Sequence, residues 1–285
     1  MGKHLDRTRS IFGSDTRGML DGGRHALLHT RTLDFDELRP YVPGDDVRDI
    51  DWKATARSGE VLIKRFVSET HHKVLLVADA GINMTALTPS GERKCDIATH
   101  ILGAIGLITL GRSDEIGMVY GDARGSINVR LRRGENHVEN MLARYHDHLS
   151  GQQGASDIVC QLTYVADHYR HTMLVVMVSD EPDPTPELEA ALQRLAGRHD
   201  LLWAMVADRS AAEDGGFDVA SGRPVLGFAA ADPRVVAAYR RAEQHRAART
   251  TELLNRHAIA HTTITSSKGI RTHIAGLTRV GSRAG

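Results

Sequence analysis

Two aspartates stand directly behind the two most apolar segments of the sequence. Asp79 ends the run KVLLVAD at residues 73–79, and Asp180 follows the run MLVVMVS at residues 173–179. In open α/β sheets, ligands bind outside the carboxyl ends of the strands. If these two strands are neighbours, both carboxylates face one crevice, where they can bind a divalent cation or take part in hydrolysis.

Hydrolysis is the less favoured of these two chemistries. Asp79 stands where the nucleophile of an aspartate-dependent phosphatase would, but that class needs a second aspartate two residues later, where this chain has Gly81. The sequence also lacks the Gly-x-x-x-x-Gly-Lys-Ser/Thr loop of ATPases and the Gly-x-Gly-x-x-Gly motif of dehydrogenases after the first strand. It has no Gly-x-Ser-x-Gly motif, which carries the nucleophile of most α/β hydrolases. We therefore expect a protein that is not an enzyme.

The elements that must position the two aspartates alternate along most of the chain. From Val74 onward, short aliphatic runs alternate with helical stretches, which is typical of βαβ units. A connector of five residues joins the second and third runs, so these should form an antiparallel hairpin. The pattern predicts an α/β fold with a doubly wound, mostly parallel six-stranded sheet and one antiparallel edge strand. The expected strands are residues 73–79, 115–120, 126–131, 173–179, 200–207 and 261–265.

The composition of the chain bears on which partners it binds and in which cellular compartment it lies. Lys plus Arg and Asp plus Glu each number 36 in 285 residues, so no net field favours nucleic acid or an anionic membrane. Cys95 and Cys160, the two cysteines, fit unpaired thiols in apolar helices better than a disulfide. The longest apolar stretch, near residues 97–110, is shorter than the roughly 20 residues of a membrane span. We expect a cytoplasmic protein without a direct membrane span.

The two aspartates also carry a resemblance. The metal-ion-dependent adhesion site of von Willebrand factor A domains is defined by a strand that ends Asp-x-Ser-x-Ser, a later Thr and a later Asp. This chain resembles that motif with substitutions. Gly81 and Asn83 stand where the serines would, and Ser156 stands for the threonine. The resemblance implies a degenerate site for Mg²⁺ or Mn²⁺ made by Asp79, Asn83, Ser156 and Asp180, in which Gly81 supplies no ligand.

A second resemblance lies in the first third of the chain. The segment LRPYVPGDDVRDIDWKATAR at residues 38–57 is similar to the signature of the "domain of unknown function 58" family, whose members couple such an arm to a von Willebrand A-like domain. The family implies a MoxR-type AAA+ ATPase and its client protein as partners. We predict an N-terminal arm at residues 1–70 and a von Willebrand factor A-like domain at residues 71–285. Asp45 or Asp46 is expected to cap a short helix that runs through Trp52.

The arm is dense in charges of both signs, which suits either docking on its own domain or binding to a partner. The residues expected to bind the partner are Arg39, Tyr41, Asp45, Asp46, Arg48, Asp51, Trp52 and Arg57. These observations favour a non-catalytic adaptor that acts with the ATPase in a chaperone-like or assembly role. The alternative is a divalent-metal-dependent binding protein or hydrolase that uses Asp79 and Asp180.

Overall fold

The computed structural model describes residues 2–13, 30–42, 50–71, 73–210, 217–219, 223–224 and 232–280. It divides the chain into two compact units, each described separately below. Unit 1 comprises Met1–Leu28 and Lys73–Gly285, and unit 2 comprises His29–His72.

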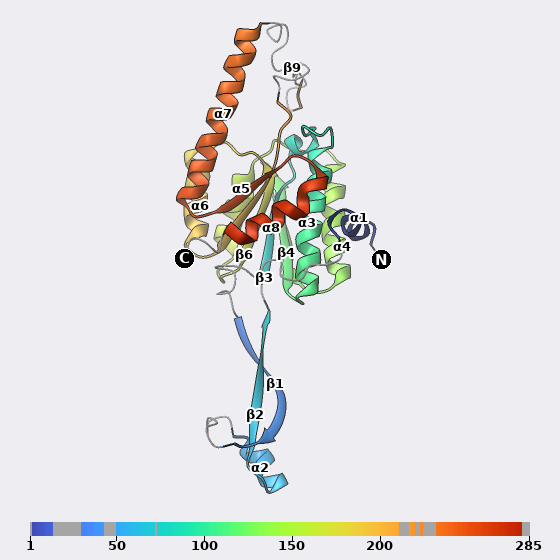
Figure 1. Cartoon of the computed structure of the whole chain (residues 1–285), viewed down its shortest axis with the longest axis vertical. Coiled ribbons are helices and arrows are strands. Elements are labelled where there is room, and N and C mark those ends of the chain that lie inside the picture. The colour runs from blue at the N-terminus through green and yellow to red at the C-terminus, as the bar shows by residue number, and fades with distance from the viewer. Residues whose placement is uncertain are drawn as a thin grey trace. The chain divides into compact units, whose positions relative to one another are not determined.

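Unit 1 is built on one six-stranded sheet (Figure 1). Its strands in chain order are β3 (Lys73–Asp79), β4 (Glu115–Asp122), β5 (Gly125–Arg132), β6 (Leu174–Asp180), β7 (Asp200–Val206) and β10 (Ala260–Ile264). They lie in the order β10-β7-β6-β3-β4-β5, and every pairing is parallel except that of β4 with β5. Numbered within the sheet this is the doubly wound order 3-2-1-4-5-6. The predicted six-stranded, mostly parallel sheet with an antiparallel edge strand is confirmed.

Helices cover both faces of this sheet, which explains why its central strands are continuous apolar runs. One hydrophobic cluster joins the sheet to α1 (Lys3–Phe12), α3 (Lys94–Gly111), α4 (Glu135–Leu149) and α8 (Ile270–Val280). The other joins it to α5 (Ile158–His168), α6 (Pro186–Ala196) and the end of α7 (Pro233–Arg256). Residues 79 and 180 therefore lie at the carboxyl edge of a sheet that is buried from both sides.

Helix α1 corrects the predicted boundary of the arm. Residues 1–30 show no clear periodicity in the sequence, yet Lys3–Phe12 form a helix whose buried side chains are Leu5, Thr8 and Phe12. Leu5 and Phe12 join the core cluster of α3 and α4, and the backbone N–H groups of His4 and Leu5 donate to the carboxylate of Glu139. The start of the chain thus belongs to unit 1, not to an arm that is continuous to residue 70. A threonine at the centre of the buried stripe concealed the helical period.

Helix α3 is the most apolar helix of the described chain. Its 18 residues have a mean hydropathy of 1.2, enough by length and composition to cross a membrane, but 83% of them are buried inside the fold. This is what a core helix under a sheet requires. Cys95 in α3 and Cys160 in α5 are both free thiols, as predicted.

Unit 2 is a β-hairpin with a short helix. Strand β1 (Thr30–Pro40) pairs antiparallel with β2 (Leu62–His71), and α2 (Trp52–Ser58) lies between them in the sequence. Asp51 caps α2 by accepting hydrogen bonds from the N–H groups of Lys53 and Ala54, both at 3.0 Å. The helix therefore starts at Trp52, whereas the predicted helix ran through it, and the proposed caps Asp45 and Asp46 lie outside the described residues.

The remaining elements of unit 1 are short. They are the 3-10 turns η3 (Ile82–Thr85) and η5 (Ser267–Gly269) and the two-residue strands β8 (Phe217–Asp218) and β9 (Arg223–Pro224). Turn η3 begins three residues after Asp79, at the carboxyl edge of the sheet.

Candidate functional site

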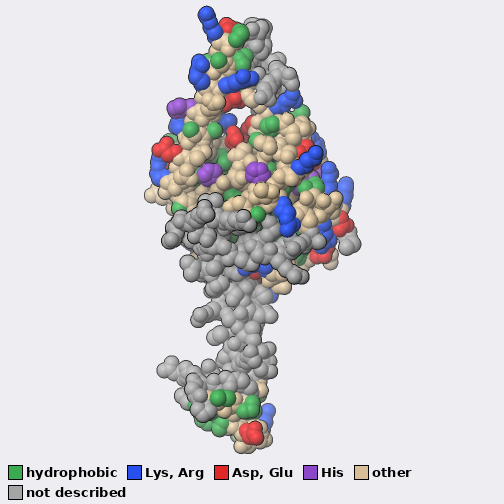
Figure 2. Space-filling model, viewed as in Figure 1, with side chains coloured by type: hydrophobic (Ala, Val, Ile, Leu, Met, Phe, Trp, Pro, Cys, Tyr) green, Lys and Arg blue, Asp and Glu red, His purple; other side chains and the backbone are tan. Residues whose placement is uncertain are grey.

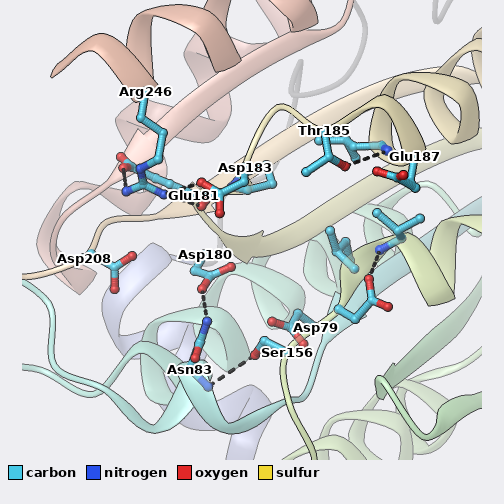
Figure 3. A pocket seen from close by; sticks show the side chains of 15 residues that line it. Asp79, Asn83, Ser156, Asp180, Glu181, Asp183, Thr185, Glu187, Asp208 and Arg246 are labelled. Carbon is cyan, nitrogen blue, oxygen red and sulfur yellow. Dashed lines mark hydrogen bonds and ion pairs between the residues drawn. The ribbon is translucent and has the colours of Figure 1, made fainter. Parts of the chain in front are cut away.

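All four predicted metal ligands line one cavity at the carboxyl edge of the sheet. Asp79, Asn83, Ser156 and Asp180 surround a space of about 470 Å³ (Figure 3). Strands β3 and β6 are parallel neighbours with Ala78 opposite Val178, which places Asp79 and Asp180 at the same edge of the sheet. The convergence expected from the sequence is thus what the structure shows.

The loop that carries Ser156 is held against η3 and the end of β4 by hydrogen bonds to its backbone. The N–H of Ile82 donates to the carbonyl of Gly154 at 2.9 Å. The carboxylate of Asp122 accepts from the N–H of Gly154 at 2.8 Å and pairs with Arg124 at 2.6 Å. The Arg124 side chain lowers the pKa of Asp122 well below its usual range. The ion pair of Asp122 with Arg124 thus supports the wall of the cavity that carries Ser156.

Asp79 is the most deeply buried acid of the cavity. It is 1% exposed; its Oδ1 accepts from the N–H of Gly81 at 2.9 Å, and its Oδ2 has no hydrogen-bond partner. Burial, with the nearby charge of Asp180 as a second cause, raises the pKa of Asp79 from 3.8 to about 7. Desolvation disfavours the charged form of a carboxyl group, so Asp79 holds its proton far above the usual pH.

The other three predicted ligands are joined to one another by hydrogen bonds. The Nδ2 of Asn83 donates to Oδ2 of Asp180 at 3.0 Å, and the backbone N–H of Asn83 donates to Oγ of Ser156 at 3.2 Å. Burial raises the pKa of Asp180, while Lys94 acts in the opposite direction. Asn83 and Ser156 thus serve as an internal network that orients Asp180.

Lys94 is a functional residue that the sequence did not reveal. Its side chain is 1% exposed, and its Nζ lies 3.8 Å from Oδ2 of Asp180 and in ion-pair contact with Oδ1 of Asp208. Asp208 follows β7, the next parallel strand, so the rule that found Asp79 and Asp180 points to it as well. No comparable signal marked Lys94, because a lysine in the first turn of a helix is usually solvated. The site therefore contains a cation of its own.

Gly81 supplies no side-chain ligand for a metal, and the backbone of Ser156 occupies the space that a side chain there would need. A Cβ at this position would lie 2.4 Å from the Cα of Ser156 and 2.6 Å from its backbone nitrogen. A serine there would require the loop of Ser156 to move. Magnesium demands near-octahedral oxygen coordination, and position 81 contributes no side-chain oxygen to such a shell. The donor set therefore lacks one side-chain ligand of a complete magnesium site.

The wider lining of the cavity is strongly acidic. Seven carboxyl side chains and one arginine, Arg246, line it: Asp79, Asp157, Asp180, Glu181, Asp183, Glu187 and Asp208. Arg246 pairs with Glu181 at 3.8 Å and with Asp183 at 3.4 Å. Burial raises the pKa of Glu181, with Arg246 opposing it. Among the residues that the structure describes, no group of three or more His, Cys, Asp and Glu side chains has the arrangement of a metal site.

The residues predicted to bind a partner belong to unit 2. Trp52 is 68% exposed and Arg57 is also exposed, while Tyr41 is half-buried and Asp51 caps α2. The side chain of Arg39 on β1, together with Asp45, Asp46 and Arg48, lies outside what the structure describes.

The order of the strands, the antiparallel third strand and the acids at the carboxyl edge define unit 1 as a von Willebrand factor A-like α/β domain. The chain belongs to the family described as "Protein of unknown function DUF58", whose model matches residues 37–220. The match covers more than half of the chain and includes the end of β1, all of β2 and the seven acids of the cavity.

Curated relatives and solved structures share parts of this architecture. The chain is 26% identical over 192 residues to the uncharacterized proteins Rv1480 of Mycobacterium tuberculosis and Mb1516 of Mycobacterium bovis. The alignment covers 67% of this chain and 60% of each relative, so the chain spans less than two thirds of their length.

Two solved von Willebrand factor A structures are similar at low identity. A type A domain protein from Catenulispora acidiphila matches with a TM-score of 0.44 and 12% identity, over 78% of this chain and 44% of that one. The SpRpn10 VWA domain matches with a TM-score of 0.42 and 9% identity, over 76% of this chain and 100% of that one. The fold assignment rests on strand order and direction, which are independent of these scores.

Proposed function

We propose that this chain is a non-catalytic adaptor that binds partner proteins through unit 2 and through the acidic cavity of unit 1. The observation that carries the proposal is a set of large apolar side chains exposed at one end of unit 2. They are Leu38, Val42, Trp52 and Val61, which are 38%, 55%, 68% and 43% exposed.

These four side chains come from one end of the hairpin. The N–H of Tyr41 donates to the carbonyl of Val61, and the N–H of Asp51 donates to that of Leu62, which ties the start of α2 to β2. Figure 2 shows hydrophobic side chains on the surface of this end of the hairpin. Grouped exposed apolar side chains mark interaction surfaces, and tryptophan is the residue type that most often dominates such contacts.

We propose a MoxR-type AAA+ ATPase, in the cytoplasm, as the partner of this surface, with a client protein as the second partner. The proposal comes from the resemblance of the arm to its family, and the exposed Trp52 gives it a residue to test. In a pull-down from the native host, we expect the wild-type chain to recover the ATPase. The Trp52→Ala variant should recover at least about tenfold less of it, because losing a central tryptophan commonly costs about 2 kcal/mol or more of binding free energy.

The matched control is Leu87→Ala, since Leu87 is 43% exposed but belongs to unit 1. It should recover as much ATPase as the wild type. Failure of the wild type to recover any AAA+ ATPase, with or without ATP, would reject the partnership. Equal recovery by Trp52→Ala would remove unit 2 as the docking surface.

The alternative function, metal-dependent binding or hydrolysis through Asp79 and Asp180, is disfavoured by Lys94. Its ammonium already supplies positive charge to Asp180, so a divalent ion would enter against an internal cation. We expect titration of Mg²⁺ or Mn²⁺ into the wild-type chain to give no more heat than titration into Asp79→Ala. Saturable heat in the wild type that vanishes in the variant would establish the metal site, and phosphatase turnover lost in Asp79→Asn would establish an enzyme.

A further inference from the structure

A second groove lies at the opposite edge of the sheet from β10, between the edge strand β5 and helix α4. It has a volume of about 460 Å³. Two arginines of β5 and one of α4 line it, together with three other α4 side chains: Arg130, Arg132, His137, Asn140, Met141 and Arg144. None of the described residues that line it is acidic. The groove is therefore basic, whereas the cavity at the carboxyl edge is acidic.

A β-bulge places arginine in this groove. Ile116 of β4 pairs with Arg132, and Met118, two residues later, pairs with Val129, so β5 contains one extra residue at this point. Val129 packs in the cluster on the α4 side, yet Leu131, two residues along, packs with the cluster on the α5 side. The alternation has shifted by one residue, which turns Arg132 to the α4 side.

The strand opposite the bulge is adapted to it. A Cβ on Gly117 of β4 would lie 2.8 Å from the carbonyl oxygen of Val129 and 3.0 Å from the nitrogen of Leu131. Only a residue without a side chain lets the bulged backbone approach so closely. Bulges commonly re-aim side chains at sheet edges, and here the result is a convergence of arginines from two elements.

The arginines and the strand edge both have unused binding capacity. Arg130, Arg132 and Arg144 are exposed and form no hydrogen bond or ion pair through their guanidinium groups with any residue that the structure describes. Strand β5 is hydrogen-bonded to β4 alone, so the outer row of its N–H and C=O groups has no strand partner in the described sheet. Charged side chains on an edge strand often have no role beyond preventing aggregation. That explanation does not account for Arg144, because it lies on α4.

We propose that β5 and the groove bind an acidic segment of a partner protein in extended conformation. The segment would pair with the edge of β5 through its backbone, and its carboxylates would face Arg130, Arg132 and Arg144. The eight residues of β5 offer an edge of about 27 Å. Backbone pairing supplies affinity in this mode of recognition and the side-chain pockets supply specificity. All residues that line the groove belong to unit 1 and none of them lines the acidic cavity, so the proposal does not depend on the function proposed above.

The test uses the full chain and a fluorescent peptide of alternating glutamate and valine, eight residues long to match β5. The wild type should bind it, with affinity that falls as salt is raised. The double variant Arg130→Glu/Arg144→Glu should bind at least about tenfold more weakly, and Arg130→Gln/Arg144→Gln should be intermediate. The charge-matched control Arg170→Glu/Arg240→Glu, at exposed sites elsewhere in unit 1, should bind as the wild type does.

Three further probes separate the parts of the proposal. A peptide with glutamine for glutamate should bind weakly, as should one methylated on alternate backbone nitrogens. Equal binding of the glutamine peptide would overturn the role of the arginines, and equal binding of the methylated peptide would overturn strand pairing. Tighter binding of a single-stranded oligonucleotide, or equal loss in the control variant, would reject the proposal. Circular dichroism of each variant establishes that it is folded.

Discussion

Replacing Lys94 by methionine is expected to lower the free energy of unfolding by about 3 kcal/mol, the largest effect of any single change in the acidic cavity. Methionine preserves the apolar stem but removes the ammonium group that lies between Asp180 and Asp208. Taking one member out of a buried charge pair leaves the other desolvated and uncompensated, which typically costs 3–5 kcal/mol. The lower end applies because Asp208 is 38% exposed and water screens it. Urea denaturation followed by circular dichroism measures the change.

The neighbouring residue provides the control for this prediction. Arg93 also pairs with a carboxylate, that of Asp96, but its side chain is 57% exposed. Arg93→Met should therefore cost less than about 1 kcal/mol, as exposed pairs do. The double variant Lys94→Met/Asp180→Asn should recover part of the loss, because it removes a carboxylate that lacks its partner. If Lys94→Met is as stable as Arg93→Met, then Lys94 is not the resident cation of the cavity.

Replacing Asp79 by asparagine is expected to remove a pH dependence of stability. The carboxyl group of Asp79 has a pKa of about 7 in the folded chain, raised from 3.8 chiefly by burial and secondarily by Asp180. A raised pKa means that the folded state binds the proton more tightly than the unfolded state. The stability that this proton provides is complete below pH 3.8 and is lost as the pH rises through about 7.

The magnitude follows from the same linkage. Between about pH 5 and pH 8 the wild-type chain should lose on the order of 2–3 kcal/mol through Asp79 that the asparagine variant does not lose. Asparagine retains an oxygen to accept the Gly81 N–H and carries no charge, so the variant should be the more stable of the two above pH 7. The measurement is the difference between the two denaturation free energies at each pH.

Asp167→Asn is the matched control for Asp79→Asn, since Asp167 is 50% exposed. The difference in free energy of unfolding between Asp167→Asn and the wild type should not change with pH by more than about 0.5 kcal/mol. A difference between the wild type and Asp79→Asn that is constant from about pH 5 to pH 8 would show that Asp79 is ionised in the folded chain throughout this range. The high pKa, and the interpretation of the cavity built on it, would then be wrong.

The sequence was sufficient for the sheet and for the meeting of its aspartates because both depend on short-range patterns. Short continuous apolar runs such as residues 173–179, rich in β-branched residues, are typical of strands covered on two faces, and alternation with helices makes them parallel. The five-residue connector between the second and third runs is too short for a crossover between parallel strands, so these two strands had to form a hairpin. Once the strands are parallel, a polar residue behind each one must lie at the same edge.

Two features of the N-terminal third needed the folded chain. Helix α1 buries Leu5 and Phe12 against α3 and α4, partners roughly ninety or more residues away in the sequence, and its own period was too weak to predict it. Strand β1 is rich in charged residues and carries no apolar run, and its pairing with β2 defines it. In both cases tertiary contacts outweigh local preference.

By itself, then, the sequence determined the six-stranded sheet, its hairpin edge and the convergence of Asp79, Asn83, Ser156 and Asp180 on one cavity. The tertiary structure alone decided what that cavity is. Lys94 reaches Asp180 and Asp208 from α3, and the loop of Ser156 closes over Gly81, so a side-chain ligand at position 81 has no room and the cavity contains a cation of its own. Periodicity predicts which residues lie at one edge of a sheet. It does not predict which side chain from a distant helix is buried among them, because that depends on packing and on the electrostatics of the completed fold.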